Sequence, residues 1–150
     1  MTDTSHDIST LNSLIATTLD SADGYAEASK DTKNAHFVTL FTELAAERRH
    51  LVSRLQSEVT TLGGEAEDDG TILAGAHRMF LNLKSLVTDH DDKAIINEVE
   101  AGEDHIKGKY EDATADTKLS PTVQSLVASA YDTVKAGHDK IRDIKHSMQH

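Results

Sequence analysis

A single proline, Pro121, interrupts the 150 residues of this chain, and only eight glycines accompany it. Proline and glycine are the residues that disfavour helix interiors most strongly. Their scarcity leaves long stretches without a helix-breaking residue, and these stretches are rich in Ala, Leu, Glu, Lys and Asp. The chain is therefore predicted to be almost entirely α-helical. Its length is that of one domain with a proper core, so residues 1–150 are expected to form a single domain.

The spacing of the apolar residues predicts four long helices, because these residues recur at steps of three and four along each of four segments. Asn34 is expected to cap the second segment, Gly63-Gly64 to end it, and Ser120-Pro121 to begin the fourth. Residues 1–7 are interpreted as a flexible polar tail in which Ser5 or Asp7 is able to cap the first helix. The four predicted helices are 8–30, 35–62, 91–115 and 121 to nearly the C-terminus.

Short polar turns separate the first helix from the second and the third from the fourth, which predicts two antiparallel hairpins. Between the hairpins lies a crossover over residues 63–90. Within it, Thr71 is expected to cap a short extra helix from Ile72 to Val87, which contains His77. The pattern assigns no role to His77. The sequence thus predicts an all-α four-helix bundle with a short helix in the crossover connection.

Composition narrows the classes of function. The formal charge of −11 and a pI near 5.1 argue against nucleic-acid binding and against attachment to anionic membranes, both of which need a basic surface. No cysteine is present, so disulfides, thiolate zinc sites and cysteine nucleophiles are excluded. The N-terminus lacks the features of a signal peptide, and no apolar run approaches a membrane span. A cytoplasmic protein is expected.

Three polar residues interrupt the apolar faces of the predicted helices: Glu47, Glu103 and His138. Each lies three or four residues from apolar neighbours on both sides. Because an unpaired buried carboxylate is costly, each glutamate needs a partner. A shared metal ion is one explanation. The alternatives are a salt bridge from Glu47 to an arginine such as Arg48, and a hydrogen-bonded core histidine at position 138.

The strongest motif for metal chemistry is Glu47-x-x-His50 on the second predicted helix. Residues three apart on a helix share a face, with Cβ atoms roughly 5–6 Å apart. Helical bundles of the di-iron carboxylate class use this pair together with glutamates from other helices. Glu47, His50 and Glu103 are therefore the candidate metal ligands.

Counting residues back from the two turns tests whether the ligand set is complete. The residue of the first helix level with Glu47 is expected near Thr18, where a di-metal site would need a glutamate. The residue level with Glu103 is expected near Tyr131. His138 lies about six residues later, roughly 9 Å further along the bundle at 1.5 Å per residue. This count predicts that Glu103 and His138 do not share one ion, and that the di-metal constellation is half present.

The segments 20–28 and 41–50 resemble the first hairpin of rubrerythrin-type ferritin-like proteins. The whole chain is similar to a bacterial family of ferritin-like four-helix-bundle proteins whose function is not defined. The similarity covers about residues 10–145. The matching pieces are Leu62-Gly63-Gly64, Gly75-Ala76-His77-Arg78, Gly102-Glu103-Asp104 and His138-Asp139-Lys140-Ile141-Arg142.

The resemblance implies a cytoplasmic ferritin-like bundle in which the ligands of the family carry over only to Glu47, His50 and Glu103. The function expected first is therefore non-enzymatic: a bundle, with a stress-associated role as one option, that acts through protein partners or self-association as a homodimer. The alternative is a metal-carboxylate protein that handles iron or reduces peroxide with an incomplete ligand set. Its cofactor would be iron or another first-row metal.

Overall fold

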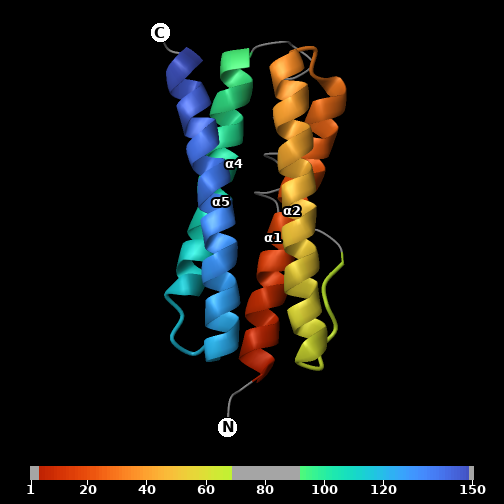
Figure 1. Cartoon of the computed structure of the whole chain (residues 1–150), viewed down its shortest axis with the longest axis vertical. Coiled ribbons are helices and arrows are strands. Elements are labelled where there is room, and N and C mark those ends of the chain that lie inside the picture. Colours follow the sequence, from red (N-terminus) through yellow and green to blue (C-terminus); the bar gives the residue numbers. More distant parts are fainter. Residues whose placement is uncertain (1–3, 69–91, 149–150) are drawn as a thin grey trace.

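The computed structural model describes residues 4–68 and 92–148. Within these ranges four long helices run along one axis (Figure 1), and they are α1 (Thr4–Asp31), α2 (Ala35–Thr61), α4 (Asp92–Thr114) and α5 (Pro121–Met148). The predicted all-α four-helix fold is confirmed, and most predicted bounds agree within two residues. The short helix expected over Ile72–Val87, with His77, lies outside the described residues.

The predicted helix boundaries have the expected chemistry. The side chain of Asn34 accepts hydrogen bonds from the backbone N–H groups of His36 and Phe37, and so caps α2. Gly63 follows the end of α2 with φ of 86°, a left-handed conformation that favours glycine. At the other hairpin, Ser120 Oγ accepts from an N–H in the first turn of α5, whose first residue is proline.

The N-terminus differs from the prediction, because α1 begins at Thr4 and residues 4–7 belong to the helix. Asp7 contacts a segment that is distant in the sequence. Its Oδ1 accepts the backbone N–H of Ser120 at 3.0 Å, just before α5. One residue earlier, His6 Nε2 lies 2.7 Å from Asp116 Oδ2. The first turn of α1 therefore binds the loop between α4 and α5, whose N–H groups have no intrahelical partner.

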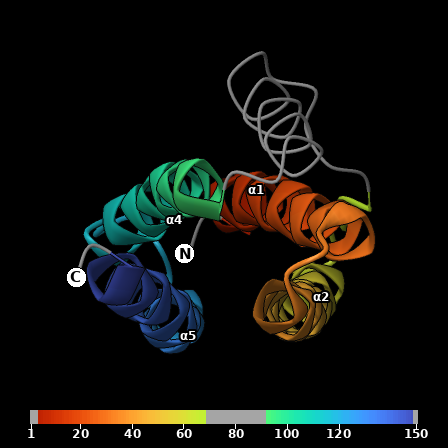
Figure 2. The same ribbon diagram turned by 90° about the horizontal axis from the view of Figure 1, so that it is seen from above.

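The two hairpins, α1–α2 and α4–α5, are more tightly packed internally than against each other. Seen along the axis, α1 and α4 lie side by side, while α2 and α5 stand apart on the opposite side of the bundle (Figure 2). The α2–α5 side is bridged by long side chains. Arg54 Nη2 donates to Ser129 Oγ at 2.9 Å, and Lys140 Nζ lies 3.5 Å from Glu43 Oε2. No helix in the described part of the chain combines the length and apolar character needed to cross a membrane.

The core consists of two apolar clusters, one toward each end of the bundle, with polar side chains between them. The cluster near the start of α1 includes Leu11, Leu55, Ile106 and Val127. The cluster near the start of α2 is built on Phe37, Phe41, Leu44, Ile96 and Ile141. The buried polar residues Arg48 and Glu103 lie at the boundary, so the middle of the bundle is the place to look for chemistry.

Tyr110 joins α4 to α1 inside the core. Its hydroxyl lies 2.8 Å from Thr18 Oγ1, and the threonine hydroxyl also donates to the backbone carbonyl of Leu14. Burial raises the pKa of Tyr110 to about 12, although the hydrogen bond with Thr18 acts in the opposite direction. Thr18 therefore serves as a hydrogen-bonding partner between hairpins, at a level where a di-metal site would need a glutamate.

The register between α4 and α5 differs from the prediction. His138 Nε2 lies 2.5 Å from Asp104 Oδ1, so His138 is level with the residue after Glu103 rather than about 9 Å beyond it. The reason is the connection between the helices. It is not a symmetric turn, and α5 begins further along the bundle than α4 ends (Figure 1).

Candidate functional site

The centre of the bundle is an ion pair between Arg48 of α2 and Glu103 of α4. Their side chains are 0% and 1% exposed. Arg48 Nη2 donates to both carboxylate oxygens, at 3.0 Å to Oε1 and 2.9 Å to Oε2. Taking both charges out of water is costly, so the pair persists only because each charge compensates the other. The pair joins the two hairpins across the bundle.

Helix α1 completes this cluster with two hydroxyl groups. Tyr25 donates a short hydrogen bond to Glu103 Oε1, and Ser21 Oγ lies 3.5 Å from Arg48 Nη1. Burial, together with the negative charge of Glu103, raises the pKa of Tyr25 well above its ordinary value. Burial alone would lower the pKa of Arg48, but the attraction of Glu103 outweighs it and the pKa is raised. Tyr25 is thus a neutral donor and Arg48 a permanent cation.

Helix α5 leaves room for the guanidinium of Arg48, because it has a glycine at position 137. A Cβ atom at Gly137 would lie 2.6 Å from Arg48 Nη2 and 3.4 Å from the side chain of Leu44. Only a residue without a side chain leaves room for the guanidinium at this point of the bundle. All four described helices therefore meet at Arg48, which is the centre of the candidate site.

Glu47 lies at the edge of this cluster. Its side chain is 41% exposed, and its Oε1 is 4.0 Å from Arg48 Nε. Both of these atoms are buried, and neither has a hydrogen-bond partner among the described residues. Burial raises the pKa of Glu47, although Arg48 acts in the opposite direction. The predicted salt bridge from Glu47 to Arg48 is confirmed.

The three predicted metal ligands are not brought together as one donor set. Glu47 and Glu103 lie on different sides of Arg48, and Glu103 is occupied by the guanidinium. His50, one turn further along α2, is exposed. In residues 4–68 and 92–148, no group of three or more His, Asp or Glu side chains is arranged to hold a metal ion. These residues do not fit the site of a di-iron carboxylate protein.

His138 has the hydrogen-bonded surroundings expected of a core histidine. Its Nε2 faces Asp104 and its Nδ1 lies 3.5 Å from Asp139 Oδ1. The alternative interpretation of His138, a hydrogen-bonded core residue, is therefore confirmed. Glu100, one turn before Glu103 on α4, does not join it as a second carboxylate, because Glu100 Oε1 accepts from Lys145 Nζ at 2.8 Å while Glu103 is fully buried.

Sequence reasoning named Arg48 only as a salt-bridge partner of Glu47, missed its pairing with Glu103, and missed Gly137 altogether. Arg48 lies four residues after Leu44 and three before Leu51, so it shares the apolar face of α2. Gly137 falls three residues after Val134 on the apolar face of α5. The sequence did contain a signal, namely a long cationic side chain on the apolar face of one helix and a glycine on the apolar face of another. Which helix faces lie opposite each other was the missing information.

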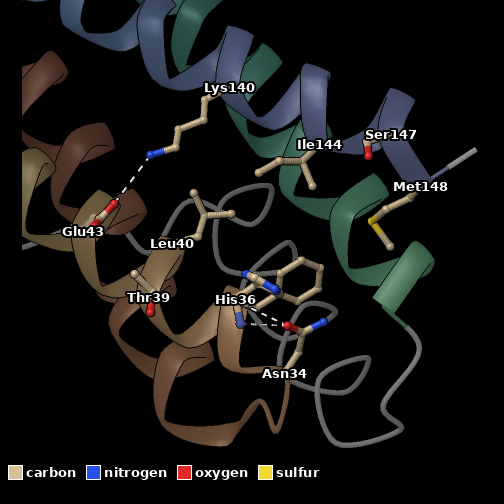
Figure 3. Close-up of a pocket in the computed structure, with 10 residues that line it drawn as sticks. Asn34, His36, Thr39, Leu40, Glu43, Lys140, Ile144, Ser147 and Met148 are labelled. Atoms are coloured by element: carbon tan, nitrogen blue, oxygen red, sulfur yellow. Dashed lines mark hydrogen bonds and ion pairs between the residues drawn. The ribbon is translucent and has the colours of Figure 1, made fainter.

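A second feature is a groove of about 500 Å³ between the start of α2 and the end of α5 (Figure 3). Its apolar lining comes from both helices. Phe37 and Leu40 are nearly buried, whereas Ile144 and Met148 are partly exposed. The polar lining consists of Asn34, His36, Thr39, Glu43, Lys140 and Ser147. The groove lies on the side of the bundle where α2 and α5 stand apart (Figure 2).

Comparison with known proteins gives one family. A family model described as "Domain of unknown function (DUF2383)" matches residues 6–116. The match spans α1, α2 and α4, and it includes Tyr25, Glu47, Arg48, His50 and Glu103. A search of curated protein sequences finds no match. The chain belongs to the DUF2383 family.

Proposed function

We propose that this protein is a non-enzymatic, ferritin-like helical bundle that acts by binding a protein partner along the groove between α2 and α5. The ferritin-like assignment is supported by the direction of the helices. In Figure 1, α2 ends at one end of the bundle and α4 begins at the other. Two antiparallel hairpins joined by one such crossover are the topology of ferritin-like folds.

The observation that carries the partner proposal is the apolar floor of the groove. Phe37 and Leu40 come from α2, and Ile144 and Met148 from α5, so two antiparallel helices both contribute apolar side chains to the groove. Grooves of this kind accept an amphipathic helix, which inserts side chains spaced three and four residues apart. A volume of about 500 Å³ accommodates several such side chains.

Charge favours a basic partner over a second copy of this chain. Each copy carries a formal charge of −11, so two copies repel each other, whereas a basic helix is attracted. At the groove itself Glu43 is paired with Lys140 at 3.5 Å, so the attraction of a basic helix comes from the net charge of the whole chain. The occupant we assign to the groove is therefore a basic amphipathic helix of another protein.

The centre of the bundle supports the non-enzymatic part of the proposal. Among the residues that the structure describes, Glu103 is the one carboxylate at the centre that is fully buried, and Arg48 and Tyr25 already occupy both of its oxygens. A carboxylate held in this way is not free to act as a base or a metal ligand. Stoichiometric first-row metal in protein purified without added metal would overturn this part, as would stabilisation by Fe(II), Mn(II) or Zn(II) that Glu47→Ala abolishes.

Binding of a model peptide tests the groove. The probe is a fluorescent amphipathic helix of Leu and Lys, and its affinity is measured by anisotropy for the wild type, Ile144→Glu and the control Ser57→Glu. Both variants add one negative charge, which by itself strengthens attraction to a basic peptide. We expect Ile144→Glu to weaken binding about tenfold or more, because a charge replaces an apolar contact, while Ser57→Glu does not.

Equal affinity of the peptide for both variants would overturn the groove as the docking site. The other candidate occupant of the groove is a second copy of this chain, and sedimentation equilibrium of the protein alone tests it. A dimer that Ile144→Glu dissociates would show that the groove binds a second copy and that the hetero-partner assignment is wrong.

A further inference from the structure

We propose that Glu103, Glu47 and Tyr25 form a built-in site for a guanidinium ion, that Arg48 is its covalently attached occupant, and that the site takes up free guanidinium when this side chain is removed. The inference concerns the middle of the bundle and is independent of the partner groove. It assigns a ligand class to a site that otherwise looks like an ordinary buried ion pair.

Two of the three nitrogens of the guanidinium face polar groups of the bundle. Its Nη2 lies at 2.9 and 3.0 Å from the two oxygens of Glu103, and its Nη1 faces the hydroxyl of Ser21. Tyr25 directs its hydrogen bond to the same carboxylate from another helix. Guanidinium is planar, permanently charged and weakly hydrated, so it suits a buried carboxylate better than an ammonium does.

With the guanidinium attached to α2 through the Arg48 side chain, two buried polar atoms of the site are left without a hydrogen bond to any residue that the structure describes. Arg48 Nε and Glu47 Oε1 are both buried, lack hydrogen-bond partners among the described residues, and are 4.0 Å apart, too far for a hydrogen bond. With Nη2 bound to Glu103, the attached side chain leaves Nε 4.0 Å from Glu47. A free ion has no such tether, and it is able to donate to both carboxylates at once.

The site also has the space that a free ion needs. Gly137 presents no side chain to the guanidinium, and its missing Cβ would lie within 2.6 Å of Nη2. Truncation of Arg48 to alanine therefore opens a pocket lined by Gly137, Glu103 and Glu47. The pocket keeps the buried carboxyl group of Glu103, which has lost its cationic partner.

A divalent metal ion fits this site less well. Such ions need four or more oxygen or nitrogen ligands at about 2.0–2.6 Å. Within the described residues, Glu103 is the one fully buried acidic ligand of the cluster, Tyr25 is a neutral donor directed at it, and Glu47 is largely at the edge. The geometry points to a singly charged ion that spreads its hydrogen bonds over a plane.

Thermal unfolding of Arg48→Ala tests the proposal. At about 20 mM, guanidinium chloride is too dilute to act as a denaturant. If the site binds guanidinium with a Kd of about 2 mM, the Tm of Arg48→Ala rises by roughly 3–6 °C relative to the same concentration of NaCl. The wild type, whose site is filled, gains nothing. The double variant Arg48→Ala/Glu103→Gln gains nothing, because it lacks the carboxylate.

Several results would overturn the proposal. One is a Tm of Arg48→Ala that responds to guanidinium no more than to NaCl, and another is the same gain in the double variant that lacks Glu103. A larger gain with MnCl₂ than with guanidinium would show that the pocket prefers a metal. If Arg48→Ala is unfolded on its own, recovery of the helical circular dichroism signal on adding 20 mM guanidinium, about the concentration used above, replaces the Tm and has the same controls.

Discussion

Replacement of Gly137 by alanine gives the clearest test of how tightly the centre of the bundle is built. In most helix interiors this change stabilises a protein by about 1 kcal/mol, because alanine has the higher helix propensity. Here the new Cβ would lie 2.6 Å from Arg48 Nη2, about 0.8 Å closer than an ordinary contact of 3.4 Å. The end of an arginine side chain is normally free to move away, so the outcome depends on what holds it.

Arg48 is held by Glu103. A displacement of about 0.8 Å either stretches its contacts of 2.9 and 3.0 Å beyond hydrogen-bonding range or compresses them. Overpacking in a core costs about 1–3 kcal/mol, and disruption of a buried ion pair costs about 3–5 kcal/mol. Subtracting the gain of about 1 kcal/mol in helix propensity leaves about 0–2 kcal/mol for overpacking and about 2–4 kcal/mol for a disrupted pair. We therefore expect Gly137→Ala to lower the free energy of unfolding by about 1–3 kcal/mol, the middle of that range, which corresponds to roughly 2–12 °C in Tm.

The assay is urea or thermal unfolding followed by circular dichroism, with Gly108→Ala as the matched control. Gly108 lies inside α4, and a Cβ there meets nothing within 4 Å, so that variant is expected to gain about 1 kcal/mol. In the Arg48→Ala background, Gly137→Ala is also expected to become stabilising, because the clash is gone. Stabilisation of the wild type by Gly137→Ala would refute the claim that Glu103 fixes the guanidinium.

Two further predictions concern buried groups. Arg48→Met and Glu103→Leu are each expected to destabilise the protein by about 3–5 kcal/mol in denaturant unfolding, and the double variant by much less than their sum, whereas additive losses would show that the two charges are not coupled. The pKa of Tyr110 is near 10 in the unfolded chain and about 12 in the folded protein. The stability that this difference contributes is therefore complete below pH 10 and is lost as the pH rises from 10 to 12, by about 1.4 kcal/mol per pH unit. Between pH 10 and 12 the free energy of unfolding is expected to fall less steeply with pH in Tyr110→Phe than in the wild type. An unchanged slope would contradict the assignment to Tyr110.

The helices could be predicted from the sequence because their signals are local. Few helix-breaking residues occur, and Asn34 and Ser120-Pro121 act as the start signals that they resemble. Burial of Glu103 and His138 followed equally from their positions on apolar faces. These inferences need only the period of the helix, which is fixed by backbone geometry.

The composition of the site was harder to predict, because it depends on which helix faces lie opposite each other. Glu47 and Arg48 are neighbours on α2, and a broad apolar face does not decide which of them points inward. The structure buries Arg48 and leaves Glu47 at the edge. The register of α5 depends on contacts of Asp116 and Ser120 with the start of α1. Because these contacts join residues more than 100 positions apart, no local pattern reveals them.

The contact between Asp7 and Ser120 also has a consequence for the order in which the molecule is made. The two residues are 113 positions apart, so the carboxylate emerges from the ribosome long before the N–H that it binds. At about 5–20 residues per second, the interval is of the order of ten seconds. The α1–α2 hairpin can form during that time, but Asp7 obtains this partner only when α5 begins. The first turn of α1 thus binds the residue that precedes α5, the last of the described helices to be synthesised.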